Sequence, residues 1–523
     1  MTSSEFVKKL IGKNTVEKKI IPYVNKNEEW RYSVARVLLT GILNNQYYRN
    51  AQDAANEALP LIIKAAKADP LYLLKAAAFA REANMKGMVK LAVAALSANA
   101  PDEFLITNRP AIVTLLSTFH PGQLMQFVDL MKSKVLGKGF GARPQKWIQS
   151  VMEGWDSQKV EVYTIKYAKD FYSLLRLAHP NYKDVRGKLV SYILTSADKG
   201  KAHGKKQKAI ERMKKLIDDK EIAKLMLDNE IPWDAVKGFH AIKGDVGLAM
   251  MTQMGLSGLL LNIRSLEQNG VLDSADSIKA LEIKLNEVKH GRSIPIDFAK
   301  PYIYSSNPKV KQLLLKAIVD SLGNSMPHIE GRKIGVSVDI SGSMYGEPLQ
   351  TAGLLAIPFL KARELWFTTF DTGLYEEPTG RTNNGHCPKL AGQTPTKQVE
   401  HLLNMKTNGG ADVGISLRQA LKDNRHLDIH VLITDEHQNT GTPLIAIWKE
   451  YKNKINSRAE LWIINATNSQ WHSADFNDPS ITVYQSMTPA IFKNLQFVGQ
   501  DLVSAINGFD HNKNNPVEDS TED

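Results

Sequence analysis

The stretch SVDISGSMYG, residues 337–346, ends an apolar run with Asp339, Ser341 and Ser343 inside five positions. The run itself, KIGVSVDIS, is short and rich in β-branched residues, which predicts a buried strand. Gly342 permits the backbone to turn, so that a carboxylate and two hydroxyl groups can face one point. Oxygen ligands with room for retained water suit Mg²⁺. The stretch therefore predicts a strand of an α/β domain with a cation site at its end.

The sequence that follows repeats the pattern of short apolar runs. Three more β-rich runs alternate with helix-like segments: ELWFTTFD (364–371), DIHVLITDE (428–436) and AELWIINAT (459–467). This alternation predicts a parallel sheet with helices on both faces, whose ligands bind at the carboxyl ends of the strands. Asp339, Asp371 and Asp435 each end a strand, and we expect Asp435 to be the second carboxylate of the cation site. The alternative is that Asp339 and the serines only cap a helix or form a turn.

These residues resemble the metal-ion-dependent adhesion site of von Willebrand factor A domains. That family has Asp-x-Ser-x-Ser, then a loop threonine, then an Asp at the end of a later strand. DISGSM and LITDE match the first and third parts, but Ala411 of TNGGADVGIS stands where the family has its hydroxyl. The resemblance implies an α/β doubly wound domain that binds a divalent cation, Mg²⁺ in our interpretation, in an incomplete site. Water or Asp412 would replace the missing ligand.

The sequence before residue 325 has a helical pattern. Apolar residues recur at three- and four-residue spacing, and prolines mark the expected helix boundaries: Pro70, Pro101, Pro110 and Pro121. Short helices joined by short breaks predict stacked antiparallel pairs, as in degenerate HEAT-like repeats. We expect four parts in the chain: an N-terminal extension (1–29), a helical repeat region (30–325), the α/β domain (326–507) and a disordered acidic tail (508–523).

Positive charge is concentrated within the helical region. The formal net charge is +11, and residues 131–220 contain 21 Lys or Arg against 9 Asp or Glu, an excess of 12. A local excess of this kind is expected where a polyanion binds, because neutralised phosphates release counterions. Aromatic side chains between the cations can stack on unpaired bases of single-stranded RNA. The alternatives are a basic face that is only solvated and aromatic side chains that pack in the core.

Part of this basic segment resembles the TROVE module of the Ro ring proteins. In YTIKYAKDFYSLLRLAHPNYKD (163–184), a helix containing Lys and Tyr is followed by Leu-Leu-Arg-Leu-Ala-His before a break. NNQYYRNAQDAANEALPLI (44–62) is similar to the opening segment of that family. The resemblance runs from about residue 30 to residue 507 and includes the order of the two domains. It implies a ring of HEAT-like helical repeats whose ends meet near a von Willebrand factor A-like domain.

Ro proteins bind small Y RNAs on their basic outer surface and admit single-stranded ends of misfolded or structured RNA through the central hole. Bacterial members are similar in using a Y-like RNA to tether polynucleotide phosphorylase. The resemblance therefore implies a role in RNA quality control or degradation. It also implies a Y RNA contact at His179, whereas the spacing before LLRLAH is shorter here than in the family. The candidate RNA-binding residues are Lys138, Arg143, Lys146, Lys166, Lys169, Arg176, His179 and Lys183.

Other features of the sequence predict the cellular compartment and the oligomeric state of the protein. The most apolar segment, residues 247–263, is interrupted by polar residues and predicts a buried helix or helix pair, so we expect no membrane partner. The N-terminus has no signal-peptide pattern. A single cysteine, Cys387, excludes an internal disulfide, which is typical of the cytoplasm. We expect a cytoplasmic monomer, because the family closes its ring within one chain.

Two other functions are compatible with a domain of the von Willebrand factor A type. An adaptor that works with an AAA-type ATPase would need an intact metal site and no special basic surface, so Ala411 and the charge distribution count against it. A magnesium-dependent nuclease or phosphatase would use Asp339 and Asp435. However, one carboxylate beside two serines leaves no evident general base, and two-metal chemistry needs more acidic ligands. We therefore expect no enzymatic activity.

Overall fold

The structure, a computed structural model, describes thirteen segments of the chain: 29–40, 51–82, 87–133, 135–137, 139–194, 202–286, 295–322, 331–362, 364–376, 386–435, 441–466, 480–485 and 502–511. Among these residues, no helix is both long enough and apolar enough to cross a membrane. Most of the predicted N-terminal extension and most of the predicted acidic tail lie outside the described residues.

The first part of the chain is helical, as predicted. Its α-helices are α2 (Glu29–Thr40), α3 (Ala51–Ala68), α4 (Pro70–Glu82), α5 (Gly87–Asn99), α6 (Asp102–Thr107), α7 (Arg109–Ser117), α8 (Pro121–Lys132), α9 (Ala142–Glu153), α10 (Ser157–Lys166), α11 (Ala168–Ala178), α12 (Val185–Val190), α13 (Lys205–Met213), α14 (Asp219–Asp228), α15 (Trp233–Lys237), α16 (Gly244–Gln253), α17 (Leu256–Gln268), α18 (Ala275–Asn286), α19 (Ala299–Tyr304) and α20 (Pro308–Ser321). Short 3₁₀ turns lie between some of them, including η1 (Ser191–Ile193) and η4 (Pro295–Phe298).

Prolines separate these helices where the sequence predicted boundaries. Pro70 and Pro121 are the first residues of α4 and α8, Pro101 precedes α6, and Pro110 lies in the first turn of α7. Proline is tolerated there because the first turn of a helix has no intrahelical partner for its N–H groups. Helices near in sequence pack together, α4 on α5, α5 on α8 and α7 on α9. The predicted segment 247–263 forms the pair α16 and α17.

The second part is an α/β domain built on one sheet. Its elements are β1 (Lys333–Asp339), η7 (Gly342–Met344), α21 (Glu347–Ala356), β2 (Glu364–Phe370), β3 (Leu374–Glu376), α22 (Pro395–Leu403), α23 (Ile415–Lys422), β4 (Ile429–Thr434), α24 (Leu444–Lys454), β5 (Glu460–Asn465) and β6 (Ile481–Gln485). Among the described strands the order is β3-β2-β1-β4-β5-β6, and all neighbours are parallel except β2 and β3. The chain reverses its direction of winding between β1 and β4, and such a switch point is where ligands bind in this fold class.

The two faces of the sheet belong to different hydrophobic cores. Val336 and Ile433 face α21 and α22 and join a core that continues into α13–α20. Leu432 and Ile463 point to the opposite side and pack with α23 and α24, where Trp448 is fully buried. Alternate residues of a strand point to opposite faces, which explains this division. The predicted sheet with helices on both faces is confirmed, and its first face shares a core with the helical part.

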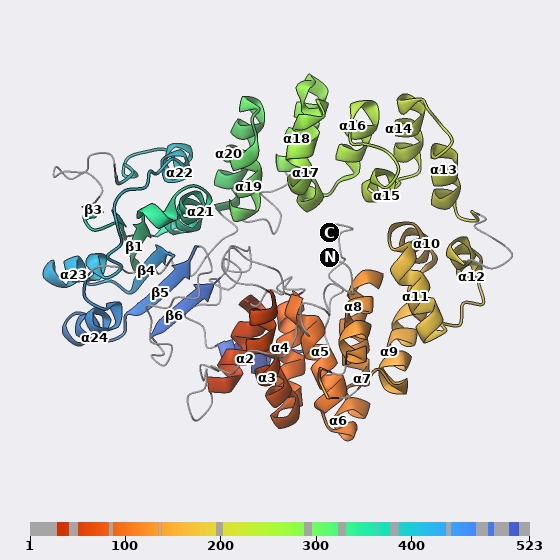
Figure 1. The fold of residues 1–523 in the computed structure, drawn as a ribbon, viewed down its shortest axis with the longest axis horizontal. Coiled ribbons are helices and arrows are strands. Elements are labelled where there is room, and N and C mark those ends of the chain that lie inside the picture. The colour runs from red at the N-terminus through yellow and green to blue at the C-terminus, as the bar shows by residue number, and fades with distance from the viewer. Residues whose placement is uncertain are drawn as a thin grey trace.

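Helices α2–α12 have a separate core, and the end of the described chain completes it. Figure 1 shows the helices following one another around a circuit, with the sheet domain between α20 and α2. The last helix, α26 (Leu502–Gly508), packs on α2 and α4, and its Ile506 is fully buried in that first core. Phe509 meets Phe79 edge to face, with ring centres 5.5 Å apart. Most of α26 falls within the predicted α/β domain (326–507), yet it packs on the helical part.

Candidate functional site

One face of α9 lies against the end of α11, in the middle of the basic segment. Lys146, Gln149 and Glu153 recur at three- and four-residue spacing, so they share this face. Gln145 Nε2 donates to the carbonyl of Leu177 at 2.8 Å, and Gln149 Nε2 donates to that of His179 at 3.4 Å. Lys146 is therefore held beside the loop that follows α11.

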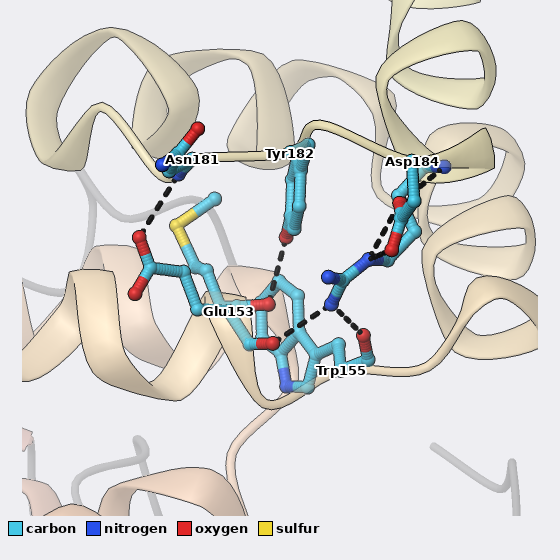
Figure 2. Close-up of polar contacts among 7 residues, drawn as sticks. Glu153, Trp155, Asn181, Tyr182 and Asp184 are labelled. Atoms are coloured by element: carbon cyan, nitrogen blue, oxygen red, sulfur yellow. Dashed lines mark hydrogen bonds and ion pairs between the residues drawn. The ribbon is translucent and has the colours of Figure 1, made fainter.

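That loop, residues 179–184, begins with a left-handed residue and is attached to α9. His179 ends α11 with φ 49° and ψ 54°. Figure 2 shows the contacts that follow: Glu153 Oε1 accepts from the backbone N–H of Asn181 at 2.9 Å, and the Tyr182 hydroxyl donates to the carbonyl of Met152 at 2.8 Å. Burial raises the pKa of Tyr182, so the hydroxyl keeps its proton and remains a donor.

Arg186, just inside α12, completes the attachment. One guanidinium nitrogen donates to the carbonyls of Glu153 and Trp155 at 2.7 and 2.8 Å, while Nε donates to the Asp184 carboxylate at 3.0 and 2.9 Å (Figure 2). The hydrogen bond from Arg186 lowers the pKa of Asp184. Sequence reasoning missed Arg186 and Glu153, because nothing in the local sequence distinguishes a charged side chain that holds a loop from one that faces solvent.

Most of the candidate cations are available to a ligand. The side chains of five candidates are exposed: Lys146, Lys169, Arg176, His179 and Lys183. Arg143 is half-exposed and forms an ion pair with the exposed Asp102 at 3.0 Å, which is worth little in water. Lys138 lies outside the described residues.

Lys166 has a different role from the one predicted. Its side chain is only 7% exposed, and its Nζ lies 2.9 Å from Asp234 in α15, which is 20% exposed. Close by, Gln207 of α13 donates to Thr164 Oγ1 and to the carbonyl of Leu189 at 2.8 and 2.9 Å. These contacts join α10 to α13 and α15, across the boundary between the two helical cores. Lys166 therefore helps to hold the two halves together, and its side chain is buried at their boundary.

The aromatic side chains of the basic segment divide between core and surface. Trp147 and Phe171 are buried, at 1% and 0% exposure, as the packing alternative predicted. Tyr167 is half-buried and stacks on His120, with ring centres 4.4 Å apart. Tyr172 is half-buried at the surface of α11, with the Arg176 guanidinium 5.8 Å from its ring centre. Of these four rings, Tyr172 is the one that lies between exposed candidate cations.

The carboxyl edge of the sheet brings together the residues predicted to hold a cation. Asp339 is fully buried, and its two oxygens accept from the backbone N–H of Ser341 at 2.8 Å and the Thr434 hydroxyl at 2.6 Å. The Ser341 and Ser343 hydroxyl oxygens are 3.2 Å apart. Burial raises the pKa of Asp339 to about 7, with a further contribution from the neighbouring carboxylate of Asp435. Two carboxylates and two hydroxyls make an oxygen-only donor set, which fits a small hard cation.

The third loop of this edge lacks a ligand, as the sequence indicated. Ala411 is buried and supplies no side-chain oxygen, and the Asp412 carboxylate forms an ion pair with Arg418. The loop is held close to β1, because the N–H of Gly342 donates to the carbonyl of Gly409 at 2.9 Å. No three His, Cys, Asp or Glu side chains gather into a metal-binding group in the described part of the chain. The edge therefore brings Asp339, Ser341 and Ser343 together beside the carboxylate of Asp435, and their role as cation ligands stays a prediction.

Comparisons with known proteins identify the fold. No protein-family model matches the chain. Among solved structures, the chain is similar to the crystal structure of the Ro (RSR) protein of Deinococcus radiodurans, with a TM-score of 0.69 and 20% sequence identity. The alignment covers 89% of this chain and 99% of that chain. The likeness therefore includes both the helical circuit and the α/β domain, and it confirms the predicted fold class.

Proposed function

We propose that this chain is a non-catalytic RNA-binding ring protein. One observation carries the proposal: a loop attached to its neighbours presents His179 and Lys183 to solvent, and Lys146, Lys169 and Arg176 of the adjoining helices α9 and α11 are exposed as well. Because the loop is already held in one conformation, its cations can neutralise phosphates without the entropic cost of ordering the loop on binding. The likeness of the fold to that of a Ro protein supports the same proposal.

The proposed ligand of the basic surface is a small structured RNA of the Y type. Single-stranded ends of misfolded or structured RNA would enter the ring, and polynucleotide phosphorylase would be brought to them by the Y-like RNA. In this proposal a monomer acts in RNA quality control in the cytoplasm. The sheet edge would hold Mg²⁺ through Asp339, Ser341, Ser343 and Asp435, with water supplying the ligand that Ala411 cannot. That ion would bind an acidic group of a partner.

The experiment begins with sequencing of the RNA that copurifies with the native protein, and we expect a small structured RNA to be enriched. Binding of that RNA is then measured at several salt concentrations. Reversing two exposed charges, with Lys146→Glu and Lys183→Glu together, should weaken binding about tenfold or more and reduce the salt slope by about 2. Lys166 is left unchanged, because its replacement would disturb folding.

A charge-matched control uses two exposed lysines outside the basic segment. Lys279 in α18 and Lys309 in α20 are changed to Glu together, which alters the net charge by the same amount. Their replacement should leave the affinity within about twofold, because surface charges beyond a Debye length are screened. Recovery of bulk ribosomal fragments alone, or equal weakening by both double variants, would refute the proposal.

A further inference from the structure

A cavity of about 600 Å³ opens at the junction of the two helical halves. It lies between α10, α11, η1, α13 and α15, and its lining includes three aromatic residues, Tyr172, Tyr192 and Phe239. Its volume falls within the range of small-ligand sites. Phe239 is 36% exposed, so part of its ring faces the opening of the cavity. The cavity thus offers aromatic surface that water can reach.

One carboxylate in this lining has an oxygen left for a ligand. Glu211 Oε1 accepts from the Tyr192 hydroxyl at 2.7 Å and from Lys214 Nζ at 2.8 Å. Across the described residues, no hydrogen bond is formed by Glu211 Oε2. The bonds from Lys214 and Tyr192 lower the pKa of Glu211, so the group is an ionised acceptor at neutral pH. Its side chain is 38% exposed, which leaves the second oxygen open to donors from outside.

The cavity adjoins the proposed RNA-binding surface. Lys169 belongs to its lining and is exposed. Arg176 lies seven residues further along α11, or roughly 10 Å along the helix axis, and its guanidinium contacts Tyr172 of the same lining. A cation, aromatic rings and a carboxylate acceptor in one lining match the parts of a nucleotide, whose phosphate is anionic and whose base is flat and carries N–H donors.

We propose that this cavity binds one unpaired nucleobase of a bound RNA and prefers bases that carry an amino group. Cytosine, adenine and guanine would donate an amino N–H to Glu211 Oε2, while Tyr172 and Phe239 contact the base and Lys169 the adjoining phosphate. Uracil has no amino group, and its one donor on that edge, N3–H, lies between two carbonyl oxygens that a carboxylate repels, so it is disfavoured. The proposal rests on the proposed function, since an RNA must bring the base to the site.

The test uses a short hairpin RNA with a blunt end and the same hairpin with one unpaired 3′ nucleotide, either C or U. Binding to the full-length protein should be about tenfold tighter with the added C than with the blunt end, and the gain should be much smaller with U. Glu211→Gln should abolish the preference for C over U, because an amide also donates. Affinity for the blunt hairpin should not change.

Two further variants keep this test decisive. Tyr172→Leu preserves apolar volume but removes a ring, and it should reduce the gain from either nucleotide. Glu221→Gln is the matched control, because Glu221 of α14 is an exposed carboxylate that pairs with Arg212 of α13, and neither residue lines the cavity. It should leave the C-over-U preference intact. Circular dichroism of each variant reports folding.

The outcomes distinguish a failure of the base site from a failure of RNA binding as a whole. If the blunt hairpin binds but an added nucleotide contributes nothing, the base site is refuted while RNA binding stands. If no hairpin binds, both fail. A titration with free cytidine monophosphate distinguishes the source of the base: saturable binding that Glu211→Gln removes, without any gain from an RNA overhang, would indicate a free-nucleotide site and overturn the proposal.

Discussion

His430 is a titratable side chain enclosed in the sheet domain. It lies in β4 with 1% exposure, and its Nε2 is 3.0 Å from the Ser416 hydroxyl. Gly335 of the adjacent strand β1 and Trp366 of β2, one strand further along the sheet, are close to the ring. Burial lowers the pKa of His430 to about 3. The folded protein therefore holds this imidazole neutral, while the unfolded chain takes up a proton near pH 6.5.

The free energy of unfolding should fall as the pH is lowered from about 6.5 toward 3, because only the unfolded state binds this proton there. The contribution of one such group is about 1.4 kcal/mol per pH unit. His430→Gln should be less stable at pH 7.5 and should lose part of this slope. Urea unfolding at pH 7.5 and pH 5 measures both quantities, and an identical slope in the variant would contradict a neutral His430.

Single residues show where sequence reasoning stopped. Lys166 and Lys169 belong to the same predicted basic helix, yet Lys166 is buried against Asp234 and Lys169 is exposed. The difference arises from α15, which approaches α10 from a distant part of the chain. Gln207 likewise gives no sign in sequence that it bonds to Thr164. Contacts between remote helices decide these roles, and local spacing does not encode them.

At the scale of elements, the ends of β1 and β4 form the candidate cation site. Mg²⁺ should stabilise the protein by about 2.7 kcal/mol when its concentration is about a hundred times the dissociation constant. Asp339→Asn should abolish this effect, because it removes the buried carboxylate. Ala411→Thr should tighten Mg²⁺ binding by supplying a hydroxyl. Thermal unfolding with MgCl₂, compared with NaCl at equal ionic strength, measures each change.

The control for this prediction lies at the opposite edge of the same sheet. Asp428 precedes β4 and accepts from the backbone N–H of Lys333 at 2.9 Å. Asp428→Asn should respond to Mg²⁺ as the unchanged protein does, even if its stability is lower. A response that survives Asp339→Asn would place the ion elsewhere.

The helices and strands were the part of this structure that the sequence predicted best. Four short apolar runs became β1, β2, β4 and β5, and prolines marked helix starts, because strands and helix termini depend on nearby residues. The antiparallel β3 was missed, since its three residues carry no periodicity. The attachment of the 179–184 loop was also missed, because it depends on Glu153 and Arg186 reaching it from two other elements.

For the whole molecule, α26 closes the helical circuit. Ile506→Ala should cost about 2–4 kcal/mol locally, because a fully buried side chain is truncated. Hydrogen exchange should then accelerate in α26 and in the facing parts of α2 and α4, while the sheet stays protected. Asn507→Ala, on the exposed side of the same helix, is the control and should change little. Equal loss of protection in the sheet would contradict a local role for α26.

The closing of the helical circuit was implied only by the resemblance to Ro ring proteins. Periodicity predicted helices before residue 325 and an α/β domain after it, but no pattern indicated that residues 502–508 return to α2 and α4. Sequence also gave no reason to expect one core to extend from α13 through α22. Both features depend on the path of the whole chain, which residue spacing does not record.

The position of α26 has a consequence for synthesis on the ribosome. Lys75 of α4 bonds to the carbonyl of Asn507, a contact between residues 432 positions apart. A ribosome adds about 5–20 residues per second, so the segment between these two residues takes on the order of 20–90 seconds to be synthesised. Throughout that time the first helices exist without Ile506, and the apolar surface that it later covers is open to chaperones or to other nascent chains. The first helical core therefore stays incomplete, and open to aggregation, until Ile506 near the end of the chain has been synthesised.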